Sequence, residues 1–484
     1  MLFPSVPFLL YFLPAAFILY WLLDFSRTAQ NACLLLLSLA FYAWGEPLHL
    51  VPMLVLIAAN HAAGRVMAHY KYRQDKRSLA RWTALFDICV LLATLHSEAL
   101  SGFAGRHFGV ALPFLPRPPL GVAFFTLQAI SYVFDIAREK ARPEKNVVNT
   151  GLFIAFFPAV LAGPILSFGD MAPQLRERKS SLPLFGMGCE RFIIGLAKVL
   201  LLAAPLSIIT ETVFNLSAAG NEVADTPVML AFLGLIAYGL QIYIAFSGYS
   251  DMAIGLGRML GFSLPENFRH PYAAHTVREF WRRCHITLYR WFFVYIFLAM
   301  GGSRPKRVKI RGAIRLRNYV LRNLVVLWIL IGMWHGISWN HFFLGIWFFA
   351  FAFLEWVISL QRRDTSHPAW SLYLIPVVAV SWVFLRCNNA GETLNFFSNL
   401  LGVNGNGFYS TLATALAREN WHVLLAAAVL CTPIGERFLN WLKGKHYGAA
   451  GYCCAAIHLA IFAALLGLSF VFLTRTGYVP FVFR

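Results

Sequence analysis

A single histidine inside an apolar stretch is the first candidate for chemistry. His335 is the lone ionisable residue between Leu324 and Trp339. An ionisable side chain at membrane depth is costly and suggests a functional site by default. Apolar surroundings favour the neutral imidazole, the form that can take a proton from a hydroxyl nucleophile. We therefore expect His335 to act as a general base, with a hydrogen bond to a neighbouring helix as the alternative. Gly332 and Gly336 flank it and would let a substrate or another backbone approach.

Further polar residues gather in the same third of the chain. His285 follows Arg282 and Arg283, and Asp251 is the only acid between Thr226 and Pro265. Asp251 could orient a base or pair with an arginine, and His285 could be an ordinary interfacial histidine.

The neighbours of these residues are candidates for binding a substrate or donor. Trp334 precedes His335, and Asn340 follows it by five residues. Arg282, Arg283 and the basic segment 304–322 could hold the phosphates of a nucleotide-like cofactor through charge-assisted hydrogen bonds. The same basic residues are equally explained as determinants of membrane topology.

The elements that must position these groups are membrane helices. Of 484 residues, 59% are hydrophobic and 13% are charged, whereas soluble domains have about 45–50% apolar and about 25% charged residues. We expect an all-α, polytopic integral membrane protein with about 11–13 transmembrane helices. The apolar runs lie near 7–25, 31–46, 50–67, 83–98, 119–137, 184–219, 226–249, 319–339, 340–361, 369–387, 421–442 and 453–474.

Two further segments depart from simple spans. The run 149–168 is interrupted by Pro158 and by Gly163-Pro164, which predicts a re-entrant or broken element. The segment Glu392–Leu401 has the apolar pattern of an interfacial helix.

The scarce charges predict an orientation. Lys and Arg exceed Asp and Glu by 41 − 22 = +19. Five loops carry most of this excess, and they fall on one side if 149–168 turns back without crossing. Cytoplasmic loops concentrate Lys and Arg, so we expect that side to be cytoplasmic and both termini, with the turn at 222–225, to be non-cytoplasmic. This assignment explains the charge without nucleic-acid binding.

Other kinds of chemistry lack their motifs. The eight cysteines form no CxxC pair and no metal-ligand spacing, and the chain has no GxxxxGK[ST], GxSxG or HExxH motif. We expect no metal and no permanently bound cofactor. No internal repeat or appended soluble segment is evident, so we expect one integral-membrane domain over residues 1–484. Missing repeats also count against the common transporter architectures.

A series of motifs resembles the membrane-bound O-acyltransferase family, and specifically its bacterial branch that contains the alginate O-acetyltransferase membrane subunit. The motifs come in the family's order over nearly the whole chain. They include Leu240-Gln-Ile-Tyr, Phe246-Ser-Gly-Tyr-Ser-Asp, Leu264-Pro-Glu-Asn-Phe, Glu279-Phe-Trp-Arg-Arg, Gly301-Gly-Ser-Arg and Trp334-His-Gly. The chain departs from the family at Cys284, where a Trp is usual, at Ala245, and at Phe293-Val294.

The resemblance implies a function and roles for both histidines. It implies that His335 and His285 are the catalytic-type pair and that the acyl donor is cytoplasmic acetyl-CoA. It implies that the acyl group ends on an exported polysaccharide outside a bacterial inner membrane, with periplasmic partner proteins completing the transfer. Acyl or D-alanyl transfer to teichoic acid, peptidoglycan or cellulose is the nearest alternative. A non-enzymatic transporter or flippase is the alternative of another class.

Overall fold

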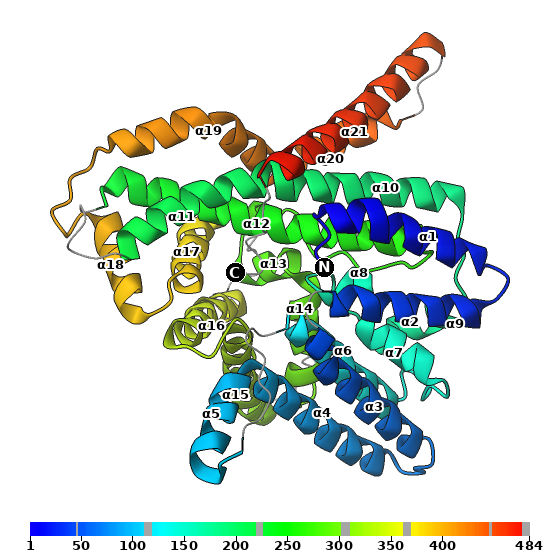
Figure 1. The fold of residues 1–484 in the computed structure, drawn as a ribbon. Helices are drawn as coiled ribbons and strands as arrows, with labels where there is room; N and C mark the ends of the chain where they lie inside the picture. Colours follow the sequence, from blue (N-terminus) through cyan, green and yellow to red (C-terminus); the bar gives the residue numbers. More distant parts are fainter. Residues whose placement is uncertain are drawn as a thin grey trace. The chain divides into compact units, whose positions relative to one another are not determined.

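A computed structural model describes residues 1–44, 47–110, 119–218, 226–301, 310–361, 369–444 and 448–476. Every regular element among these residues is a helix (Figure 1). The expected all-α, multi-pass membrane class is confirmed. Six described helices are each long and apolar enough to cross a membrane, or seven if one bent pair is a single span, and six further apolar helices are shorter. The expected total of 11–13 spans stays a prediction.

The chain divides into two compact units. The first comprises Met1–Ile193 and Tyr249–Glu266, and the second comprises Ile194–Gly248 and Asn267–Val482. The helix α12 (Val228–Met259) contributes residues to both units. The expectation of one domain over residues 1–484 stays a prediction.

The first unit is built around helix α6, which is buried along nearly its whole length. Helices α3 and α4 pack on α6, and α2 and α3 pack on α7 (Figure 1). A helix that is apolar on all sides is stable only when neighbours cover it. The helices of this unit are α1 (Leu13–Leu22), α2 (Arg27–Ala43), α3 (Leu50–Met67), α4 (Arg73–Leu95), α5 (Ser97–Phe108), α6 (Val122–Ala137), α7 (Val147–Ala155), α8 (Phe157–Val160), α9 (Phe168–Arg176) and most of α10 (Leu182–Ala197).

The broken element expected at 149–168 is confirmed as a helical break. Helix α7 ends at Ala155, α8 lasts four residues, and the chain then turns at Gly163. All these residues are buried, and Ser38 accepts a hydrogen bond from the Phe157 N–H at 3.1 Å. Neighbouring side chains therefore satisfy backbone that the break leaves without a helical partner.

The second unit contains the remaining helices. Its π-helical turns are Lys198–Ala203 and Phe293–Phe297. Its α-helices are α11 (Ala204–Ala218), the first part of α12, α13 (Val277–Arg283), α14 (Ile286–Phe292), α15 (Ile310–Trp334), α16 (Trp339–Gln361), α17 (Ala369–Arg386), α18 (Ala390–Leu401), α19 (Thr411–Leu430), α20 (Ile434–Leu442) and α21 (Gly448–Thr476). Helices α15 and α16 form its most extensive pair, and α17 packs on α16.

Several of the expected elements are wrong in their limits, and two of them show the causes. The run 421–442 is not one helix, because α19 and α20 meet at a 78° bend across a break at 431–433. The last residue of this break, Pro433, cannot donate a backbone hydrogen bond. Helix α4 begins at Arg73, ten residues before the apolar run 83–98. Its first three turns therefore hold Arg73, Lys76, Arg77 and Arg81, which hydropathy had assigned to a loop.

Some expectations fall wholly or partly outside the described residues. These are the turn at 222–225, Gly302–Arg304 of the Gly-Gly-Ser-Arg motif, and the side chains of residues 304–319 in the basic segment. Helix α18 covers the expected interfacial segment Glu392–Leu401 as a helix; its place at the interface stays a prediction.

Candidate active site

His335 lies in a turn that ends helix α15, which corrects the expectation that it lies within the helix. The His335 N–H bonds the Gly332 carbonyl, and the Gly336 N–H bonds the Met333 carbonyl, each at 3.1 Å. Gly336 has a φ of +154°, a backbone conformation that side chains disfavour. Gly336 therefore keeps α15, which ends at Trp334, from continuing past the histidine, and α16 begins at Trp339.

The turn is held by a close approach of two helix backbones. A Cβ on Gly332 would overlap the His341 carbonyl oxygen and lie 2.8 Å from the Gly345 nitrogen. A Cβ on Gly345 would lie 2.6 Å from the Trp328 carbonyl oxygen. Of the two uses expected for Gly332, close contact with another backbone is therefore present.

His285 lies in a different local structure, between the short helices α13 and α14. Its φ is +46°, which places a non-glycine residue in the left-handed region. Such a conformation persists only when surrounding contacts impose it, and it is concentrated at functional sites.

Asn267 supplies those contacts around His285. Its carbonyl accepts the Ile286 N–H at 2.9 Å, and its Oδ1 accepts both the Thr287 N–H at 3.1 Å and the Thr287 hydroxyl at 2.8 Å. The Arg269 N–H bonds the Arg283 carbonyl at 2.8 Å. The two segments thus pair on both sides of His285. Sequence reasoning missed Asn267 as a contributor, although it lies in one of the quoted motifs.

The indole of Trp334 contacts both histidines. Its ring centroid is 5.7 Å from that of His285 and 5.0 Å from that of His335, and both contacts are edge-to-face. The rings of Phe246 and Phe268 lie 6.2 Å and 5.9 Å from His285. The structure therefore brings together three of the predicted site residues within aromatic walls.

His341 adds a third imidazole beside this group. Its ring centroid lies 6.3 Å from that of His335, and its Nδ1 lies 2.9 Å from the Ser338 hydroxyl. His341 follows His335 by six residues, but sequence reasoning gave it no role.

A buried carboxylate anchors the start of helix α13. Glu355 on α16 accepts hydrogen bonds from the Val277 N–H, from the Arg278 N–H at 3.1 Å, and from the Tyr373 hydroxyl. Carboxylates are favoured at helix N-termini, where backbone N–H groups lack partners. Sequence reasoning missed Glu355, although it is the only acidic residue in the apolar run 340–361.

The two predicted arginines differ in their surroundings. Arg282 is exposed, whereas the Arg283 guanidinium donates to Glu279 at 2.6 Å along α13. Partial burial opposes ionisation of Glu279, but hydrogen bonds from the His275 N–H and from Arg283 outweigh it and lower the pKa of this carboxyl.

The side chain of Asn340 is buried and bonds to the protein backbone. It is 1% exposed, and its amide donates to the Cys387 carbonyl at 2.7 Å. This bond joins the start of α16 to the end of α17.

Asp251 lies in the first unit and forms an ion cluster there. The Arg191 guanidinium lies 2.6 Å from Asp251 and 2.7 Å from Glu266, and Arg258 lies 3.9 Å from Glu266. Pairing with an arginine was one of the two uses expected for Asp251. Arg191 was missed, although a charged residue inside the run 184–219 was a visible signal.

Comparisons with known proteins agree with this architecture. Residues 66–387 match the model of the membrane-bound O-acyltransferase family. The chain is 34% identical over 404 residues to the probable alginate O-acetylase of Azotobacter vinelandii, with 80% of this chain and 76% of that protein covered. The corresponding protein of Pseudomonas fluorescens is 34% identical, with 80% and 73% covered. The peptidoglycan O-acetyltransferase of Helicobacter pylori is 27% identical, with 84% and 80% covered.

Proposed function

This chain belongs to the membrane-bound O-acyltransferase family, and from that premise we propose that it transfers acetyl from cytoplasmic acetyl-CoA for O-acetylation of an exported polysaccharide such as alginate. The observation that carries the proposal is the contact of one indole, Trp334, with both His285 and His335. The names of the relatives at 34% identity favour alginate as the polymer.

In the proposed reaction His335 is the general base. Its neutral imidazole takes the proton of an acceptor hydroxyl while the hydroxyl oxygen attacks the thioester carbonyl. The C–S bond then breaks, and the imidazolium returns the proton to the leaving thiolate of CoA. The products are an acetyl ester and free CoA. The reaction changes no oxidation state, so its atoms and electrons balance without a redox partner.

The neighbouring residues have positioning roles in this proposal. His285 orients the donor or the acceptor, and the aromatic walls formed by Trp334, Phe246 and Phe268 exclude water that would hydrolyse the thioester. The exposed Arg282, with Arg283 beside it, attracts the phosphates of CoA. Asn340 supports the site indirectly through its bond to the Cys387 carbonyl, and Asp251 stabilises the end of α12 through Arg191.

We place the protein in a bacterial inner membrane, with the basic loops in the cytoplasm and both termini outside. The acceptor polymer lies on the opposite side of the membrane from the donor. Periplasmic partner proteins therefore complete the delivery of the acetyl group.

The first test compares a deletion strain complemented with wild type, His335→Ala or His422→Ala. His422 is an exposed histidine on α19 of the same unit, so its variant is a matched control. With equal amounts in the membrane, mass analysis of surface polymers should show acetyl esters lost in His335→Ala and kept in His422→Ala. Full acetylation in His335→Ala would refute the role of this histidine.

The same mass analysis separates the alternatives. Acetylated peptidoglycan or cellulose, or D-alanyl esters on teichoic acid, would keep the enzyme class and change the substrate. A reconstituted protein that moves substrate across the bilayer and breaks no thioester would instead be a transporter.

A further inference from the structure

Helix α4 of the first unit buries an acid within its apolar part. Asp87 is 0% exposed, although α4 is long and apolar enough to cross a membrane. The other buried residues of α4 are small or polar, namely Ala80, Thr83, Ala84 and Thr94, whereas its exposed residues include the large apolar ones, Trp82, Leu85, Phe86, Ile88 and Leu92. Small residues let membrane helices approach closely, and polar residues join them by hydrogen bonds. The buried face of α4 therefore contacts its neighbours through a carboxyl group.

A single hydrogen bond holds Asp87, and it comes from an amide on the neighbouring helix α3. The Asn60 amide nitrogen donates to Asp87 Oδ1 and to the Leu56 carbonyl, each at 2.9 Å. The other carboxyl oxygen, Asp87 Oδ2, and the amide oxygen, Asn60 Oδ1, are both buried without a partner among the described residues. Buried acceptors without donors are unfavourable. The pair of side chains therefore lacks one hydrogen.

No cation pairs with Asp87 in the part of the chain that the structure describes. The titratable and charged side chains on the helices packed against α4 are His61 and Arg65 of α3, Tyr132 and Asp135 of α6, and Glu98, Arg106 and His107 of α5. None of the described hydrogen bonds or ion pairs joins one of them to Asp87. The charged residues of α4 itself lie in its first three turns, and the last of them, Arg81, is exposed.

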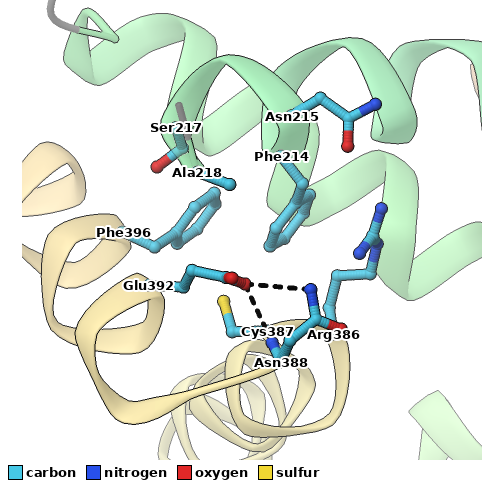
Figure 2. Close-up of a pocket in the computed structure, with 9 residues that line it drawn as sticks. All are labelled: Phe214, Asn215, Ser217, Ala218, Arg386, Cys387, Asn388, Glu392 and Phe396. Carbon is cyan, nitrogen blue, oxygen red and sulfur yellow. Dashed lines mark hydrogen bonds between the residues drawn. The ribbon is translucent and has the colours of Figure 1, made fainter. Parts of the chain in front are cut away.

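Another acid of the chain shows how a charged carboxylate is held without a cation. Glu392 on α18 is partly exposed, and it accepts from the Asn388 N–H at 2.9 Å, from the Asn388 side chain at 3.1 Å and from the Asn389 side chain at 2.8 Å (Figure 2). Asp87 has one donor in place of three and no exposed surface. A buried carboxylate without a cation takes up a proton rather than keep its charge.

We propose that Asp87 is a proton-binding site, which holds a proton in the folded chain at neutral pH and thereby fastens α4 to α3. A carboxylic acid and a primary amide can form two reciprocal hydrogen bonds. The bond from the Asn60 amide to Asp87 Oδ1 is present, and the Asp87 Oδ2–H donates to Asn60 Oδ1. One proton thus satisfies both unpaired oxygens and removes the buried charge. The site lies outside the proposed acyl-transfer chemistry and does not depend on it.

A monovalent cation is the competing ligand for these oxygens. Helix α6 packs on both α3 and α4 and carries Gln128, whose buried amide oxygen and nitrogen also lack partners among the described residues. Hard cations take oxygen ligands, so Na⁺ is the ion to test. The Asn60 amide, however, directs an N–H donor at the carboxyl. That donor suits an acid, whereas it would repel a cation bound to the same group.

Proton binding at Asp87 makes the packing of α4 depend on pH. Unfolding exposes the side chain to water, where an aspartate is ionised above about pH 4, so unfolding releases one proton. Stability falls as pH rises wherever the folded chain binds more protons than the unfolded chain. The contribution of Asp87 to the unfolding equilibrium constant should therefore rise with pH, by up to about tenfold per pH unit, the limit for one proton.

The test uses the full chain in lipid nanodiscs and compares wild type with Asp87→Asn and Asp75→Asn. Asp75 is an exposed acid in the first turn of the same helix, so its variant is the matched control. Infrared difference spectra at pH 7 should show that Asp87→Asn loses the C=O band of a carboxylic acid and that Asp75→Asn loses only carboxylate bands. Thermal unfolding should depend less on pH in Asp87→Asn than in wild type, whereas Asp75→Asn should keep the wild-type profile.

Asn60→Leu keeps the test decisive if Asp87→Asn does not fold. It removes the amide partner of Asp87, so the acid band should move to higher frequency, and a band that stays in place would contradict the assignment. Three further results would overturn the proposal. They are loss of a carboxylate band in Asp87→Asn, a wild type that gains stability over Asp87→Asn as pH rises, and stabilisation by sodium chloride over choline chloride that disappears in Asp87→Asn, which would assign the site to Na⁺.

Discussion

The two histidines of the candidate site are positioned by opposite means. His335 follows a helix whose backbone touches that of the next helix at Gly332 and Gly345. The position of His335 therefore depends on these two residues having no side chain. His285 lies between two short helices, and the hydrogen bonds that its neighbours Ile286 and Thr287 donate to Asn267 set its place. Only His285 of the two has a positive φ.

This difference predicts different sensitivities. Close-packed backbones cannot yield to an added atom, because protein interiors are packed as densely as crystals. A loop held by hydrogen bonds depends on individual donors and acceptors, so its response follows the chemistry of the substitution more than its volume. Both arrangements place an imidazole ring against the indole of Trp334.

The largest effect should come from adding one methyl group beneath His335. Gly332→Ala places a Cβ on the His341 carbonyl, so the helices must separate. We expect the free energy of unfolding to fall by about 2–3 kcal/mol, and acyl transfer to fall about 10²-fold because the base is displaced. Thermal unfolding in detergent measures the loss of stability, and the rate of CoA release measures the loss of acyl transfer.

The control for this variant is Gly467→Ala on helix α21, where an added Cβ meets nothing within 4 Å. That change should keep or slightly raise stability, since alanine favours helix. Equal behaviour of the two variants would contradict the close-packing account of His335.

The next effect should come from the acceptor beside His285. Asn267→Ala leaves the buried Thr287 N–H and hydroxyl without their shared oxygen, and we expect a loss of about 1–3 kcal/mol in the free energy of unfolding. Asn267→Asp keeps an oxygen at the same place and should recover most stability and most acyl transfer. If both variants lose equally, hydrogen bonding does not set the place of His285.

A smaller effect should distinguish the backbone conformations at His285 and His335 directly. At His285 the positive φ penalises any Cβ, so His285→Gly should be more stable than His285→Ala by about 1 kcal/mol. At His335 the glycine variant should gain no such advantage over the alanine variant. Chemical denaturation of the four purified variants measures the difference in the free energy of unfolding. If glycine is more stable than alanine at both positions, the two histidines do not differ in backbone conformation as proposed.

The smallest effect concerns the ion pair along α13. The pKa of Glu279 is lowered in the folded chain, so its contribution to stability is present above its ordinary pKa and is lost as pH falls through the folded value. Wild type should exceed Glu279→Gln by about 0.5 kcal/mol or less at pH 7, because the pair is partly exposed. The gap should close in acid; a gap that widens as pH falls would contradict this sign.

Much of the site was predictable from residue types. His285, His335 and Trp334 were identified from their sequence context, and the structure places their rings in contact. Glu355 and Arg191 left a signal, each as a charge inside an apolar run, but hydropathy cannot say which group a buried charge meets. Asn267 left only its place in a quoted motif, since a polar residue in a loop is otherwise ordinary.

Helix limits show the same division. Hydropathy located α3 closely, because its apolar run and the helix coincide, but it placed the start of α4 ten residues late. Hydropathy measures where a chain prefers lipid, whereas a helix continues through charged residues that favour helical backbone. The bend between α19 and α20 needed the effect of Pro433 to be weighed above a continuous apolar run.

The amino-acid sequence by itself determined the membrane class, the candidate histidines and the family, because burial of apolar surface and the types of reactive side chains are properties of composition and local order. Only the tertiary structure decided how the histidines are held, which acid caps α13, and what surrounds Asp87. Those facts depend on contacts between residues far apart in the chain, where a missing Cβ or one shared oxygen selects the geometry.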